Sequence, residues 1–242
     1  MVVSEKLKWE YEMSKLHSEY GSELHLLRYM GRHREELDRL VGAAIGGEVV
    51  RWLDFAFARG NTPPDAEPKG IAWSSPDADR SRAWREFWPV TGEQMNWDAV
   101  GEATVKGKRA WLMVEAKGHL RELESNCGAK PATQKGGRDQ IEMTLNEVKN
   151  ELGVEHKRSW LLRYYQYCNR LAVLHFLRRQ NIPAEMLFVY FTGDTPSKSR
   201  QCPRNAQGWA AALRVMHEYV GLPEDSGLRG HVHQLFLPVC PR

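Results

Sequence analysis

Hydrophobic residues at the start of the chain recur at the three- and four-residue spacing that is typical of amphipathic helices. This pattern predicts a helix over 4–19 and a second helix over 22–44, with Ser22 as the N-cap of the second. The next apolar stretch, at 48–57, is compatible with either a short helix or a strand. We therefore expect residues 1–60 to form an N-terminal helical region.

Beyond a Pro- and Gly-rich loop at 60–70, short apolar runs bounded by turn residues predict strands, and longer periodic runs predict helices. The predicted strands are 84–90, 95–105, 109–117, 184–193 and 231–239. The predicted helices are 139–152, 158–180 and 209–221. This order predicts an α/β fold with a central mixed sheet flanked by helices. We expect a single domain over 1–242, with a sheet-containing core at 80–242.

Composition narrows the class of protein. The chain has 242 residues, of which 42% are hydrophobic and 27% charged, as in globular domains. The net charge of +3 permits a nucleic-acid partner without arguing for one. The four cysteines lie far apart and form no Cys-x-x-Cys pair, so no structural zinc site is expected. The chain shows no signal peptide and no apolar run near the roughly 20 residues of a membrane helix. We expect a cytoplasmic protein with free thiols and no membrane partner.

The strand predicted at 109–117 ends in an unusual way, because an apolar run passes directly into Glu115 and Lys117. Gly107 and Lys108 predict a two-residue turn between this strand and the preceding one. That turn would place Lys106 opposite Arg109 and so define the pairing of the whole hairpin.

In this register Asp98 lies opposite Lys117, and Val100 lies opposite Glu115. Directly opposed residues point to the same face, as do residues two apart on one strand. Asp98, Glu115 and Lys117 are therefore expected to converge on one patch. The other face would be apolar and would pack against a helix; it consists of Trp97, Ala99, Ala103, Val105, Leu112, Val114 and Ala116.

Two carboxylates and a lysine on one sheet face suit a hard divalent cation such as Mg²⁺ or Mn²⁺. The cation would stabilise charge on a phosphoryl oxygen, and Lys117 would position the attacking water or contact the phosphate. The alternative is a solvated ion pair between Asp98 and Lys117, which contributes little.

Asp98 followed by Glu115-Ala116-Lys117 on the next strand resembles the signature of the PD-(D/E)xK nuclease superfamily, which has the restriction-endonuclease-like fold. Trp97 stands where the family often has Pro. The family core is a helix, three antiparallel strands, a helix and a strand, and the predicted order matches it over about 20–195. The resemblance implies that Asp98, Glu115 and the Ala116 carbonyl bind Mg²⁺, for which Mn²⁺ can substitute. It also implies that Lys117 assists the water that attacks a phosphodiester.

Many relatives carry an extra glutamate on the first core helix. Glu23 is the candidate here, with Glu35 and Glu36 as rivals, and a solvated helix face is the alternative for each. Glu86, predicted on the strand before the hairpin, is a further acid that could add a ligand or be an edge-strand charge.

Some relatives place Gln-x-x-x-Tyr on the helix after the motif, whereas Gln166 is followed at this spacing by Arg170. Both residues share one helix face and are candidates for contact with the site or with nucleic acid. An ordinary amphipathic helix face is the alternative. Two basic loops are further candidates for contact with phosphates; their charged residues are Lys130, Lys135, Arg138, Lys198, Arg200 and Arg204.

His231 and His233 share one strand face and would suit a metal, but no third ligand is identifiable from the sequence. Ordinary surface or core histidines are therefore expected at these positions.

These observations together predict a Mg²⁺-dependent nuclease that hydrolyses phosphodiester bonds, with DNA as the expected partner. One alternative is a catalytically inactive module on the same fold that binds nucleic acid or protein. Another is a scaffold protein with a chance motif, in which the three side chains would not converge. A homodimer is compatible with the sequence, which leaves open whether the substrate is single- or double-stranded.

Overall fold

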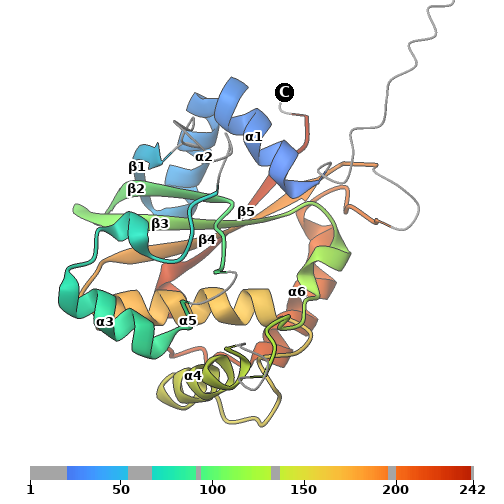
Figure 1. Ribbon diagram of the computed structural model, residues 1–242. Helices are drawn as coiled ribbons and strands as arrows, with labels where there is room; N and C mark the ends of the chain where they lie inside the picture. Colours follow the sequence, from blue (N-terminus) through green and yellow to red (C-terminus); the bar gives the residue numbers. More distant parts are fainter. Residues whose placement is uncertain (1–20, 54–66, 91–93, 132–136, 196–199, 241–242) are drawn as a thin grey trace, which may run out of the picture.

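The computed structural model describes residues 21–53, 67–90, 94–131, 137–195 and 200–240. The described residues form a five-stranded sheet with helices on both faces (Figure 1). The predicted helix at 4–19 lies outside them. Within the described part of the chain, no helix combines the length and apolar character needed to cross a bilayer.

The sheet has the strand order β1-β2-β3-β4-β5. Its strands are β1 (Gly47–Leu53), β2 (Ala99–Val105), β3 (Lys108–Lys117), β4 (Ala184–Thr192) and β5 (Val232–Pro238). The first three strands pair antiparallel, and β3, β4 and β5 pair parallel. The predicted mixed sheet flanked by helices is therefore confirmed.

Helices cover the sheet in two layers, with the N-terminal pair on one face and the later helices on the other (Figure 1). The N-terminal pair is α1 (Ser22–Arg32) and α2 (Arg34–Ile45). The later helices are α3 (Ala78–Phe87), α4 (Arg138–Glu151), α5 (Tyr165–Arg179) and α6 (Ala206–Val220). All residues of β4 are buried, because this apolar strand packs against both layers.

The prediction of a strand at 84–90 is wrong, because α3 continues to Phe87. The Asp77 carboxylate caps α3 by accepting the Arg80 N–H at 2.8 Å. Trp84 and Trp88 favoured a strand by composition, but their four-residue spacing places both rings on one side of the helix axis. The strand that pairs with β2 is instead β1. The stretch 48–57, which the sequence left open between helix and strand, is therefore a strand over its described part. The N-terminal region 1–60, predicted to be helical, thus contributes a strand to the sheet.

Two predicted helices are shorter in the structure. The stretch 22–44 is divided at His33 into α1 and α2. The helix predicted at 158–180 begins only at Tyr165. The reason lies far away in the sequence: Ser125 accepts the Tyr165 N–H with its carbonyl, at 3.1 Å, and the Gln166 N–H with its hydroxyl, at 2.9 Å. This contact satisfies two N–H groups at the start of α5 and sets where the helix begins.

The turn of the central hairpin lies one residue earlier than predicted. Val105 pairs with Lys108, so the two turn residues are Lys106 and Gly107, with φ values of 51° and 73°. Positive φ at both positions is characteristic of a type I′ turn, which matches the twist of the flanking strands. Because the pairing moves by two residues, the faces are unchanged.

The corrected register changes the neighbours of the motif residues. Val100 pairs with Met113 rather than Glu115, and Asp98, which directly precedes β2, lies beside Glu115 rather than Lys117. The predicted apolar face is observed against α1 and α2, except for Trp97. Trp97 lies outside the strand alternation and is buried on the other face, where its indole N–H donates to the Gly70 carbonyl at 2.7 Å.

Candidate functional site

Glu115 and Lys117 lie at the carboxyl end of β3 and point toward α5. Their exposed fractions are 2% and 8%, so both charges are almost removed from water. The Lys117 ammonium donates directly to Glu115 Oε1. Buried charges of this kind are tolerated only when they are paired and hydrogen-bonded.

Helix α5 supplies a second polar pair that meets the first. Gln166 Oε1 accepts from Lys117 Nζ at 2.8 Å, and Arg170 Nε donates to Glu115 Oε2 at 2.8 Å. The two helix residues are one turn apart and so face the two strand residues together. Gln166, Lys117, Glu115 and Arg170 therefore form a continuous chain of contacts, which we call the β3–α5 network.

Arg170 is fixed by four kinds of contact. Besides Glu115, its guanidinium donates to the Asn96 carbonyl at 2.6 Å and to Asn169 Oδ1 at 2.9 Å. Its Cζ lies 4.5 Å from the ring centre of Trp97. A buried arginine in such a setting orients the acid that it contacts. The geometry thus places Arg170 inside the β3–α5 network rather than on an open surface that nucleic acid would touch.

Asp98 adds a second carboxylate to this network. It is half-buried, and its Oδ2 accepts the Ala116 N–H at 2.6 Å. Burial, together with the negative charge of Glu115, raises the pKa of Asp98 to about 8. Burial alone would also raise the pKa of Glu115, but the charges of Arg170 and Lys117 outweigh it and hold that pKa below its usual value. The two neighbouring acids are thus pushed in opposite directions, a feature that is common at functional sites.

The donor set fits a hard cation such as Mg²⁺. Asp98 and Glu115 are neighbouring carboxylates, and Mg²⁺ is commonly held by one or two carboxylates together with waters and substrate phosphates. Both Glu115 oxygens are engaged by Lys117 and Arg170, but each carboxylate oxygen offers a further lone pair. Among the described residues, no three His, Cys, Asp or Glu side chains are arranged to hold a metal by themselves. A cation here would therefore need water, substrate or backbone oxygens, for which the Ala116 carbonyl is the candidate that the motif implies.

A third acid at the site, Glu67, was not predicted. Its segment pairs with the residues before Asp98: Lys69 forms a β-bridge with Asn96, and the Trp97 N–H donates to the Pro68 carbonyl at 3.0 Å. Burial raises the pKa of Glu67, and the charges of Glu23 and Glu115 add to that effect. No local sequence pattern identifies Glu67, because only a non-local pairing brings it here.

Glu23 lies on the first turn of α1 and is exposed, but its charge acts on Glu67, so it lies near the site. The close approach of α1 to the end of β3 explains this position. A Cβ on Gly118 would lie 2.9 Å from the Ser22 backbone nitrogen, so only glycine fits there without displacement. The rival Glu36 pairs instead with Arg39 on α2.

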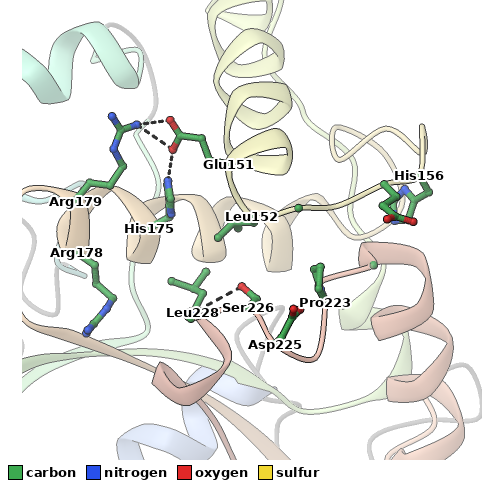
Figure 2. A pocket seen from close by; sticks show the side chains of 14 residues that line it. Glu151, Leu152, His156, His175, Arg178, Arg179, Pro223, Asp225, Ser226 and Leu228 are labelled. Carbon is green, nitrogen blue, oxygen red and sulfur yellow. Dashed lines mark hydrogen bonds and ion pairs between the residues drawn. The ribbon is translucent and has the colours of Figure 1, made fainter.

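A cavity of about 740 Å³ opens beside Asp98. Gln166 and Arg170 of α5 form one side of it, and the exposed Lys130 lies at its edge. A larger cavity, of about 1020 Å³, lies at the other end of α5. Figure 2 shows that the acid of this second cavity, Glu151, is already paired with His175 and Arg179. Because none of the motif residues lines it, the second cavity is not the candidate site.

Two further predicted residues, Glu86 and Arg200, do not line the cavity. Glu86 is exposed on α3, not on a strand. Arg200 is exposed and lines a separate surface hollow with Leu120 and Cys202. Lys135 and Lys198 lie outside the described residues.

His231 and His233 share a partner that the sequence did not indicate. Glu185 on β4 is buried and accepts from His231 Nδ1 at 2.9 Å and from His233 Nε2 at 2.8 Å. Burial alone would raise the pKa of Glu185, but the hydrogen bonds from the two histidines hold it below its usual value. Each imidazole contacts a different oxygen, so the cluster is a hydrogen-bonded clamp between β4 and β5.

Comparisons with models of protein families, with curated proteins and with solved structures find no match to this chain.

Proposed function

We propose that this protein is a Mg²⁺-dependent nuclease of the PD-(D/E)xK type that hydrolyses phosphodiester bonds, with DNA as its substrate. The observation that carries the proposal is the convergence of three residues: Asp98, which directly precedes β2 and lines a cavity, interacts with Glu115 and Lys117 at the end of β3. Three antiparallel strands, β1 to β3, and a parallel strand, β4, that follows α4 and α5 support a restriction-endonuclease-like core, into which α3 is inserted between β1 and β2.

Asp98 and Glu115 would hold the cation, which stabilises negative charge on the phosphate and acidifies a bound water. Lys117 has three N–H donors, of which Glu115 and Gln166 take two. The third meets no acceptor among the described residues, so it is available to orient a water molecule or a phosphate oxygen. Gln166 and Arg170 are positioning residues, since the first holds Lys117 and the second holds Glu115.

The first experiment incubates the purified protein with supercoiled plasmid and with a single-stranded circle. Each substrate is tested with Mg²⁺, with Mn²⁺ and with EDTA. Lys117→Ala is run beside the wild type, and Lys108→Ala, at the exposed opposite end of β3, is the matched control. We expect cutting that requires metal, disappears in Lys117→Ala and persists in Lys108→Ala. Cutting that survives in Lys117→Ala would contradict the proposed site.

A second candidate function is a binding module in which the same fold has lost catalysis. In a site that has lost catalysis, Glu115 would still stabilise the fold, because both of its oxygens are paired inside the protein. A Mn²⁺ titration of the wild type and of Asp98→Ala separates the two functions. Binding that needs Asp98 supports the nuclease, and absence of binding in both proteins supports the module.

A further inference from the structure

The cavity beside Asp98 is lined by several segments that lie far apart in the sequence. The segment that leads into β2 forms one wall, the chain around Gly128 forms the second, and the first two turns of α5 form the third. Its volume of about 740 Å³ lies within the range of pockets that bury a small molecule. Because Asp98 belongs to the wall, a phosphate bound through a cation at Asp98 would place the adjoining nucleotide at the mouth of this cavity.

The chemistry of the lining is that of a base pocket rather than of a groove for a DNA backbone. Trp88, Met95 and Ile141 contribute apolar surface, and Tyr165 and Asn169 contribute neutral hydrogen-bonding groups. Of the two cations in the lining, Arg170 is held by Glu115 and Lys130 is exposed, and two acids, Glu67 and Asp98, lie in the same lining. A surface that tracks phosphates carries several available cations, whereas nucleobases are held by flat apolar contacts and by amide groups.

A base inside a duplex cannot reach a cavity of this kind. It must first leave the stack, which requires free energy for unpairing and unstacking, whereas an unpaired nucleotide has no base pair to break. On the basis of the proposed nuclease function, we infer that the cavity receives the base of an unpaired nucleotide next to the scissile phosphate. The preferred substrate is therefore single-stranded nucleic acid.

Gly128 offers a direct test, because it lines the cavity and a Cβ built there meets no atom within 4 Å. Gly128→Trp would add a large ring to the lining of the cavity without straining the backbone. Gly230→Trp is the matched control, since Gly230 is also exposed and unobstructed but lies outside the cavity. Thermal melts by circular dichroism verify that both variants fold.

The assay measures metal-dependent cutting of an end-labelled single strand and of the same sequence as a blunt duplex. We expect the wild type to cut the single strand at least tenfold faster. Gly128→Trp should cut the single strand at least tenfold more slowly than the wild type, and Gly230→Trp should cut it at the wild-type rate. A single strand with one abasic nucleotide should lose the cut at the adjoining bond. Equal rates on both substrates, with Gly128→Trp unaffected, would overturn the base pocket while leaving the nuclease intact.

If the wild type cuts nothing, the nuclease proposal fails, and the pocket is judged by binding instead. Fluorescence anisotropy with a labelled single-stranded oligonucleotide and its duplex is then the readout. Tighter binding of the single strand that Gly128→Trp weakens, and Gly230→Trp does not, would support the pocket. Equal binding of the two forms, or no effect of Gly128→Trp, would refute it.

Discussion

Two buried glutamates of the central sheet have much in common, and their difference indicates where function resides. Glu115 at the end of β3 is held by Lys117 and Arg170, and Glu185 at the start of β4 is held by His231 and His233. In both cases basic partners keep the pKa of the acid below its usual value despite burial. A buried, paired acid therefore does not by itself identify a functional site.

What separates the two places is a second acid beside Glu115. Asp98 is a second carboxylate that lines a cavity and whose pKa is raised to about 8. Glu185 has no comparable neighbour among the described residues, and each of its oxygens is already bonded to a histidine. Glu185 is held within the sheet by its two histidines, whereas Asp98 lines a cavity.

The largest expected difference concerns activity. Asp98→Asn should reduce metal-dependent cutting by at least about 100-fold, because the cation loses a charged ligand worth several kcal/mol. Glu185→Gln should remain within about twofold of the wild type, since it alters only the clamp between β4 and β5. Initial rates at saturating Mg²⁺ measure both. A similar loss in the two variants would remove the distinction between the clusters.

The next difference concerns stability in metal-free buffer. Glu115→Gln should lower the free energy of unfolding by about 3–5 kcal/mol, because Lys117 and Arg170 would lose the carboxylate that both of them contact directly. Asp98→Asn keeps an acceptor for the Ala116 N–H and resembles the protonated form of Asp98, which a pKa of about 8 favours at pH 7, so it should change stability by about 1 kcal/mol or less. Urea unfolding at pH 7 measures both. Equal destabilisation by the two substitutions would show that the buried cations depend on both carboxylates to the same extent.

A smaller loss of stability is expected when Arg170, which orients Glu115, is replaced. Arg170→Lys keeps the charge but loses the planar fork and its contact with Trp97. We expect a loss of about 1–2 kcal/mol in unfolding free energy, with a lower rate of cutting. Arg85→Lys, at an exposed position on α3, should stay within about 0.5 kcal/mol. If Arg170→Lys left the unfolding free energy unchanged, the positive charge alone would be sufficient to hold Glu115.

The smallest effect is the pH dependence of the Glu185 clamp. The pKa of Glu185 is lower in the folded state than in the unfolded state, where it is about 4.3. The clamp therefore contributes its full stability above the unfolded-state pKa and loses that stability as the pH falls through the folded-state pKa. Glu185→Gln should therefore be less stable than the wild type by about 1 kcal/mol at pH 7. The gap should close when urea unfolding is repeated below pH 4, and a gap that widens with acidity would contradict this origin.

Local patterns were sufficient for much of the site. The two-residue period of strands put Asp98, Glu115 and Lys117 on one face, and a turn misplaced by one residue did not alter that result. The Gln166–Arg170 spacing correctly placed both side chains on one side of α5. The prediction at 84–90 was wrong, because Ala78–Phe87 form a helix in which Trp84 is buried against the core.

By itself, the sequence determined the alternation of helices and strands, the apolar strand β4 and the shared face of the motif residues, because these depend on periods within one segment. Only the tertiary structure decided the contacts between segments. It brought Glu67 to Asp98 through the bridge at Lys69, started α5 at the Ser125 cap and gave His231 and His233 their acid. Such pairings join residues far apart in the chain, so no local period encodes them, and they form only when the sheet and its two helical layers pack together.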